Sequence, residues 1–146
     1  MKKLYLILLC LCFSGITLWG GEVNTGRFNN VAIEGYDAVA YHLVGTPMKG
    51  KPVFKTIWKK AQWHFISKKN LILFLRNPKK YAPQYGGFCA NGLSDGHKVR
   101  GDPKNWRIHK GKLYLFYSKR GRDSWNYNIE EQIHLADKYW EKVKYQ

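Results

Sequence analysis

The sequence predicts an α+β fold in which small antiparallel β-hairpins pack with short helices and a C-terminal amphipathic helix. Apolar and polar residues alternate in two places, each interrupted by a short turn, and this pattern indicates two hairpins. Near the C-terminus, apolar residues recur at steps of three and four, as expected for a helix with one buried face. The chain of 146 residues shows no Gly/Ser-rich or Pro-rich linker and no evident internal repeat, so we expect one domain.

The first 20 residues have the layout of a secretion signal. Lys2 and Lys3 precede an almost wholly apolar run over 4–19, and small residues follow. We therefore expect residues 1–20 to be a signal peptide and the protein to be exported, to the periplasm. The alternative is an uncleaved N-terminal anchor, which would be the chain's only link to a membrane, because Leu18 or Trp19 stands where a small residue is usual. A lipoprotein through Cys10 or Cys12 fits the pattern less well.

The chain is strongly basic, with a formal net charge of +15, and only two of its lysines lie in the first 20 residues. Such a charge favours an anionic partner. Export argues against nucleic acid and favours an anionic component of the envelope. The alternative is a solvated basic surface, because the Lys and Arg residues are scattered along the sequence.

The first half of the domain is expected to contain one hairpin. A turn at Gly35–Asp37 comes first, and a short apolar strand is predicted over 38–42. The hairpin follows, with strands over 53–58 and 62–66 and a bend at 59–61.

A helix is predicted next, over 68–76, with Ser67 as its N-cap and a proline after its end. Residues 78–83 suggest a single turn or a loop. The pair Gly86 and Gly87 permits backbone conformations or close approaches that a side chain would prevent. A short helix is expected over 88–93.

The second hairpin is predicted over 106–109 and 113–117, with a turn between them. The last helix is expected after Asn128, whose spacing from Glu131 resembles a capping box. Its apolar stripe comprises Ile129, Ile133, Ala136, Trp140 and Val143.

Cys89 is the only cysteine beyond residue 20, which excludes a disulfide-stapled scaffold. The chain also lacks a Walker loop and the GxGxxG, HExxH, CxxC and GxSxG motifs. Cys89 is either a small buried apolar residue or a thiolate activated near a helix N-terminus. A thiolate could bind a soft metal or attack an electrophile.

Histidines and turn aspartates are the other candidate site residues. The five histidines show no close spacing, so a metal site would require His42 or His64 to meet Cys89 from distant segments. Asp37, beside Tyr36, and Asp102 each lie in a turn. They are either ligand-binding groups beside a pocket or ordinary hydrogen-bond acceptors of the turn backbone.

Several longer strings resemble the exported, single-domain YHS-domain proteins of bacteria, over residues 28–143. They are GYDAVAY (35–41), WHFIS (63–67), Phe74, PKKYAPQYGGFCA (78–90), Asp102-Pro103 to Trp106, and GKLYL (111–115). The resemblance implies a YHS-like domain. Shorter relatives of this family occur in copper-transporting ATPases and other metal-related proteins, where paired cysteines suggest a metal-binding role.

The chain departs from these shorter relatives where they carry cysteines. The corresponding stretches, Asp37–Ala40 and Phe65–Asn70, contain none, and a contiguous Tyr-His-Ser string is missing. One thiol with imidazoles could hold Cu(I) or Zn(II), but without the usual chelate of several thiolates. Any copper or zinc ion is therefore expected to be weakly held, by Cys89 with His64 or His42.

The sequence favours a small exported non-enzymatic domain that binds a ligand, a metal ion included, in a pocket near Cys89. Tyr36, Asp37, Cys89 and Asp102 are the candidate ligand-binding residues. Two alternatives stay open. A thiol enzyme or redox sensor would use Cys89 with a neighbouring base. A ligand-free envelope interaction domain would instead show an exposed aromatic patch.

Overall fold

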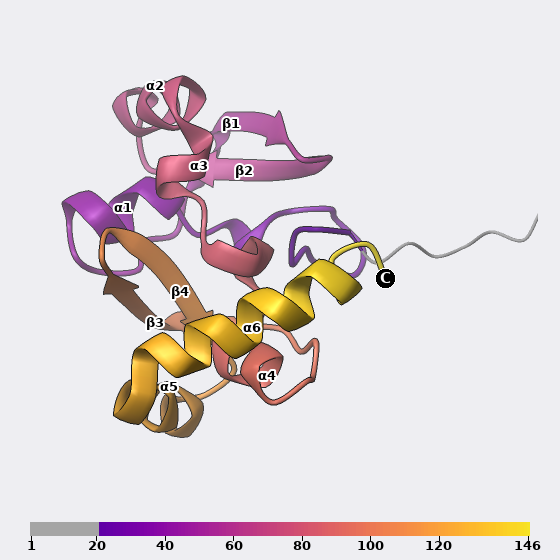
Figure 1. The fold of residues 1–146 in the computed structure, drawn as a ribbon. Helices are drawn as coiled ribbons and strands as arrows, with labels where there is room; N and C mark the ends of the chain where they lie inside the picture. Colours follow the sequence, from indigo (N-terminus) through magenta and orange to yellow (C-terminus); the bar gives the residue numbers. More distant parts are fainter. Residues whose placement is uncertain (1–20) are drawn as a thin grey trace, which may run out of the picture.

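A computed structural model describes residues 21–146, and the predicted signal segment, residues 1–20, lies outside the described residues. Two separate two-stranded antiparallel sheets and several short helices confirm the α+β prediction (Figure 1). The elements in chain order are η1 (Ile33–Gly35), α1 (Ala38–Leu43), β1 (Lys51–Trp58), β2 (Ala61–Phe65), α2 (Lys68–Arg76), α3 (Pro78–Tyr81), η2 (Gln84–Gly87), α4 (Ala90–Ser94), β3 (Asp102–His109), β4 (Lys112–Phe116), α5 (Lys119–Trp125), η3 (Asn126–Asn128) and α6 (Ile129–Val143).

Both predicted hairpins are confirmed. β1 and β2 are joined by Lys59 and Lys60, and both residues adopt the left-handed backbone conformation that a tight two-residue turn requires. β3 and β4 are joined in the same way by Lys110 and Gly111. Each hairpin's first strand begins earlier than predicted, because its first residue still pairs with the last residue of the second strand.

The strand predicted over 38–42 is wrong, because these residues form the helix α1. Asp37 decides the outcome: its carboxylate accepts hydrogen bonds from the N–H groups of Val39 (2.8 Å) and Ala40 (3.1 Å). An aspartate N-cap stabilises a helical first turn. The segment is too short for its apolar residues to distinguish a helix from a strand.

The predicted helices α2 and α4 are confirmed, and Ser67 caps α2 by accepting a hydrogen bond from the N–H of Asn70 at 3.2 Å. The sequence analysis missed α5. Ser118 caps it in the same way, through the N–H of Gly121 at 3.2 Å. Only Trp125 of α5 is buried, so the segment shows no apolar periodicity.

The C-terminal helix α6 is confirmed, and its predicted stripe packs against the second hydrophobic cluster. Ala136 and Val143 are buried, and the other members of the stripe are partly buried. The prediction of a capping box is wrong, because the side chain of Asn128 makes no capping hydrogen bond.

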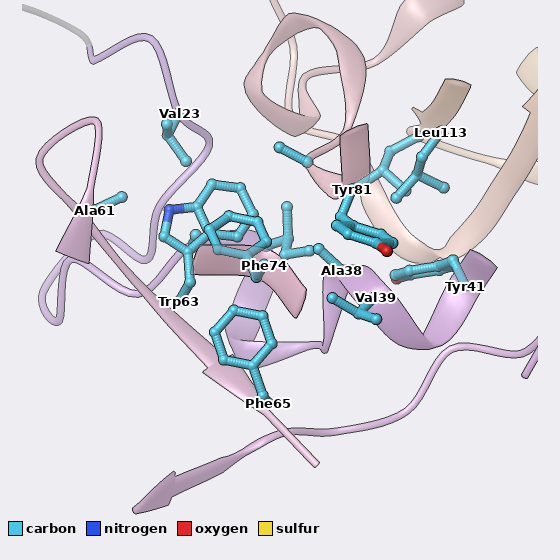
Figure 2. Packing of buried hydrophobic residues seen from close by; sticks show 14 residues of the cluster. Val23, Ala38, Val39, Tyr41, Ala61, Trp63, Phe65, Phe74, Tyr81 and Leu113 are labelled. Atoms are coloured by element: carbon cyan, nitrogen blue, oxygen red, sulfur yellow. The ribbon is translucent and has the colours of Figure 1, made fainter. Parts of the chain in front are cut away.

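Strand β4 links two hydrophobic clusters. Leu113 and Leu115 belong to the first cluster, which is built around Phe74 (Figure 2). Tyr114 and Phe116 belong to the second, which is covered by α6 (Figure 1). Successive side chains of a strand point to opposite faces, so one short strand supplies both clusters. Among residues 21–146, no helix is long and apolar enough to cross a bilayer.

The structure contains an internal repeat that the sequence analysis did not find. The first unit, residues 33–76, and the second unit, residues 85–125, both consist of a 3-10 turn, a short helix, a hairpin and a capped helix. In the hairpins, each residue of the second unit lies 51 positions after its counterpart. The pair Lys51–Phe65 thus corresponds to the pair Asp102–Phe116, and the register is irregular at the same place in both hairpins.

The 3-10 turns of the two units also share an unusual backbone. Three successive residues have positive φ in each unit, at a separation of 52 positions, and the loop between helix and hairpin absorbs the one-residue difference. The φ values are 42°, 55° and 77° for Ile33, Glu34 and Gly35, and 55°, 61° and 88° for Tyr85, Gly86 and Gly87.

Aromatic packing repeats as well. The last helix of each unit places one ring against two rings of the second strand of its own hairpin, with nearly equal centroid distances. The pairs are Phe74 with Trp63 (5.1 Å) and Phe65 (5.0 Å), and Trp125 with Tyr114 (4.9 Å) and Phe116 (5.2 Å). Backbone pairing, turn geometry and ring packing therefore describe one structural unit built twice.

Gly86 provides a test of close backbone packing. Glu34, its counterpart, shows that a side chain tolerates this backbone conformation, but a Cβ at Gly86 would lie 1.7 Å from the carbonyl oxygen of Glu22. We expect Gly86→Ala to lower the free energy of unfolding by about 2–4 kcal/mol, combining conformational strain and overpacking.

Gly45→Ala is the matched control, measured by the same urea denaturation. Gly45 also has positive φ (73°), but a Cβ there would meet nothing within 4 Å. Its expected cost is about 1 kcal/mol, from backbone conformation alone. Equal losses in the two variants would contradict the close approach at Gly86.

Candidate functional site

Cys89 lies at the junction of η2 and α4, where it is the N-cap of α4. Only 3% of the residue is exposed. Its Sγ accepts a hydrogen bond from the N–H of Gly92 at 3.3 Å, and its own N–H donates to the carbonyl oxygen of Val99 at 2.9 Å. The thiol is thus held in a fixed position at the start of the helix.

A pocket of about 550 Å³ opens beside Cys89, between α4, the segment that follows it and α5. This volume is within the range of small-molecule sites. We call it the Cys89 pocket. Its walls are formed by Cys89, Asn91, Gly92, Asp95, Val99, Tyr117, Ser118, Arg120, Gly121 and Ser124.

Asp37, a predicted ligand-binding residue, lies elsewhere and is fully buried. Besides capping α1 with Oδ1, it accepts hydrogen bonds at Oδ2 from the N–H of Ile66 and from Nδ2 of Asn70, both at 2.8 Å. These bonds join α1, the end of β2 and α2. Both oxygens are therefore engaged within the protein, and the structure gives Asp37 a structural role.

Tyr36 and Asp102 also lie outside the Cys89 pocket. The ring of Tyr36 lies 4.8 Å from the ammonium group of Lys49. Asp102 accepts hydrogen bonds from the N–H of Lys104 (2.8 Å) and from Nδ2 of Asn105 (3.0 Å). Asp102 thus makes the backbone hydrogen bond expected of a turn aspartate, and it also lines a separate pocket with Glu34 and Arg100, so its ligand-binding role stays a prediction.

The candidate metal ligands are not brought together. His64 bonds to Gln62 through Nε2 at 2.7 Å, and burial is the main cause that lowers its pKa. His42 packs edge-on against Tyr81, and burial likewise lowers its pKa. Among residues 21–146, no histidine lines the Cys89 pocket, and no three His, Cys, Asp or Glu side chains form a group suited to a metal ion.

The sequence analysis missed the far wall of the pocket, which is formed by α5. Ser118, Arg120 and Gly121 carry no motif of their own. The signal that could have found them is the repeat, because Ser118 corresponds to Ser67 and Gly121 to Asn70 in the first unit.

Cys89 is the counterpart of Asp37. Both are the N-cap of the short helix of their unit. The N–H of Asp37 donates to the carbonyl oxygen of Met48 at 2.8 Å, as that of Cys89 does to Val99. Gly92, which donates to Sγ, corresponds to Ala40, which donates to Oδ1. Sγ of Cys89 therefore accepts a helix N–H at the position where Oδ1 of Asp37 accepts one in the first unit.

No side chain of the second unit replaces the other oxygen. In the first unit Oδ2 meets the side chain of Asn70, which is 5% exposed. The counterpart of Asn70 is Gly121, which has no side chain and lines the Cys89 pocket. The pocket thus lies where the first unit is filled by a carboxylate and an amide.

Comparison of the chain with protein-family models, with curated proteins and with solved structures found no match in any of the three. The YHS resemblance of residues 28–143 stays a prediction from the motifs.

The structural role of Asp37 predicts a large loss of stability on truncation. Asp37→Ala would leave four buried or partly buried N–H donors without their acceptor. We expect the free energy of unfolding to fall by roughly 3–5 kcal/mol, measured by urea denaturation. Ser67→Ala, which removes one cap, is the control and should cost about 1 kcal/mol. A ligand-binding role alone would leave the stability of Asp37→Ala nearly unchanged.

Because the pKa values of His42 and His64 are lowered in the folded protein, we expect the free energy of unfolding to fall in mild acid. Burial lowers the pKa of His42 in the folded state, with Lys80 contributing, so the unfolded chain binds the proton more readily. This contribution is fully present above the unfolded pKa of about 6.5 and is lost as the pH falls through the folded pKa.

We expect His42→Asn to reduce the decrease in stability between about pH 7 and pH 5, followed by urea denaturation at each pH. His64 contributes with the same sign, so part of the dependence should remain. His134→Asn, at an exposed position of α6, is the control. An unchanged pH profile in His42→Asn would contradict the role assigned to burial.

Proposed function

We propose that this protein is a small, exported, non-enzymatic domain that binds an organic ligand in the Cys89 pocket. One observation carries the proposal: the second unit is open at the place where the first unit is closed by its own side chains. Since the two units otherwise share backbone pairing and packing, a pocket at this position is a specific difference.

The proposed location of the protein and its proposed family both rest on the sequence alone. Export to the periplasm rests on the apolar N-terminal run and its two lysines. The YHS-like assignment rests on the motifs over 28–143, and an anionic envelope partner on the charge of +15.

A metal ion is the weaker candidate for the ligand. The pocket offers one thiol, and its one carboxylate, that of Asp95, accepts a hydrogen bond from Nδ2 of Asn91 at 2.7 Å. Copper and zinc sites in proteins use several thiolate or imidazole ligands. The described walls of the pocket provide no imidazole.

A ligand-free interaction domain is the second candidate function. Its support is on β1, where Val53 and Ile57 are 76% and 63% exposed. An exposed apolar strand can pair with another chain. A thiol enzyme has less support, because an activated cysteine needs a neighbouring base and the described pocket wall contains no histidine.

Native mass spectrometry of the protein recovered from the envelope tests the proposal directly. We expect a bound organic molecule, retained in the control Gly45→Ala and lost in Gly121→Leu, whose side chain would enter the pocket. A Cβ at Gly121 would meet its nearest neighbour, Oδ1 of Asn91, at 3.4 Å, which is ordinary van der Waals contact, so the first atom of the new side chain fits.

Thiol labelling gives a second readout. Because Cys89 is 3% exposed, labelling should be on the order of 100-fold slower in the native protein than after unfolding, and slower still with ligand bound. A bound metal mass that disappears in Cys89→Ser would favour the metal site instead. Absence of any bound mass, with equal labelling rates in native and unfolded protein, would favour the interaction domain.

A further inference from the structure

We propose that the ligand of the Cys89 pocket is a small organic carboxylate, and that one of its oxygens takes the place that Oδ2 of Asp37 has in the first unit. This inference rests on the proposed function and adds the chemical class of the ligand. In the first unit this position is occupied by a carboxylate oxygen of the protein itself, Oδ2 of Asp37. The shared backbone arrangement can therefore surround a carboxylate there.

In the first unit, the four hydrogen-bond donors around Asp37 are divided between its two carboxylate oxygens. Oδ1 of Asp37 receives N–H groups from the start of α1, and Oδ2 receives the N–H of Ile66 and the amide of Asn70. In the second unit Sγ of Cys89 receives only the first kind of donor, from Gly92. The acceptor that corresponds to Oδ2 is missing.

The donor that would meet this acceptor is present. The counterpart of Ile66 is Tyr117, which lines the pocket, and its N–H makes no hydrogen bond within residues 21–146. The second donor of the first unit, Asn70, has no equivalent, because its counterpart Gly121 has no side chain, and the nearest atom to a Cβ there would be Oδ1 of Asn91, at 3.4 Å. A carboxylate bound in the pocket would therefore have a backbone N–H, that of Tyr117, available in the wall that also includes Cys89.

Charge favours an anion at the rim of the pocket. Arg120 lines the pocket, is exposed, and belongs to no ion pair within residues 21–146. Arginine binds carboxylates through parallel hydrogen bonds. The opposing charge is that of Asp95, which also lines the pocket and accepts a hydrogen bond from Asn91. The charge of Asp123 is shared with Lys119 and Arg122.

The size of the pocket indicates more than an inorganic anion. A volume of about 550 Å³ accommodates an organic body attached to the carboxylate. Val99 and Tyr117 are the larger apolar residues among those that line the pocket. The expected ligand thus has an acidic group near Cys89 and an apolar body against Val99.

Matched acids and amides test the charge requirement. Phenylacetate and butyrate, and their amides phenylacetamide and butyramide, are titrated into the exported ¹⁵N-labelled protein and followed by amide NMR at pH 7. We expect the acids to bind on the order of 10-fold more tightly than the amides, and to shift the signals of Tyr117 and Gly92 most.

Two sets of variants locate the site. Arg120→Gln should weaken the acids several-fold, whereas Arg122→Gln, outside the pocket wall, should leave their affinity unchanged. The double variant Cys89→Asp/Gly121→Asn rebuilds the first unit's carboxylate and amide inside the second. We expect it to abolish acid binding while the Tm stays at or above that of the parent protein.

The outcomes separate the two proposals. Amides that bind as tightly as acids, with the same Tyr117 shifts, would overturn the carboxylate inference and leave the ligand-binding function standing. If neither series binds and native mass spectrometry also shows no bound molecule, the ligand-binding function fails and the inference fails with it.

Discussion

The carboxylate of Asp37 is the interaction on which the first half of the molecule depends. A single buried side chain satisfies the start of α1, the backbone after β2 and the side chain of Asn70. A buried charge is tolerable only when it is fully hydrogen-bonded. The four donors around Asp37 therefore fix the positions of two helices relative to the hairpin, and the cluster around Phe74 forms within that frame.

The second half has the same frame without that carboxylate. The side chain of Cys89 accepts one hydrogen bond where that of Asp37 accepts four, so the helix α4 must be held in another way. It packs instead against α6, an element with no equivalent in the first unit, and Leu93 and Ala136 are fully buried at the contact side. The long C-terminal helix thus compensates for a weaker polar junction, and the Cys89 pocket lies at that junction.

Much of the fold was predictable because local signals were strong. Ser67 and the alternating residues of the two hairpins identify their elements without tertiary information, and so does the apolar stripe of α6. Helix α1 could not be separated from a strand over so few residues, and α5 buries only Trp125.

The repeat was missed because only a minority of the matching positions are identical, such as Phe65 with Phe116 and Ser67 with Ser118, whereas most others differ. Phe74 corresponds to Trp125, and Asp37 to Cys89. Cys89 was predictable as a site candidate because it is the only thiol beyond residue 20. The pocket was not, because Gly121 becomes informative only once its counterpart Asn70 is known to be occupied.

The position of β4 in both clusters makes the two units mutually dependent during folding. The first unit ends at residue 76, but its core lacks Leu113 and Leu115 until β4 is in place. A nascent chain that has emerged only to α2 would lack these two leucines, and could not complete its core until the chain was available as far as β4, which ends at Phe116 of 146 residues. Despite its repeated plan, the protein should therefore behave as one cooperative folding unit, without a stable autonomous half.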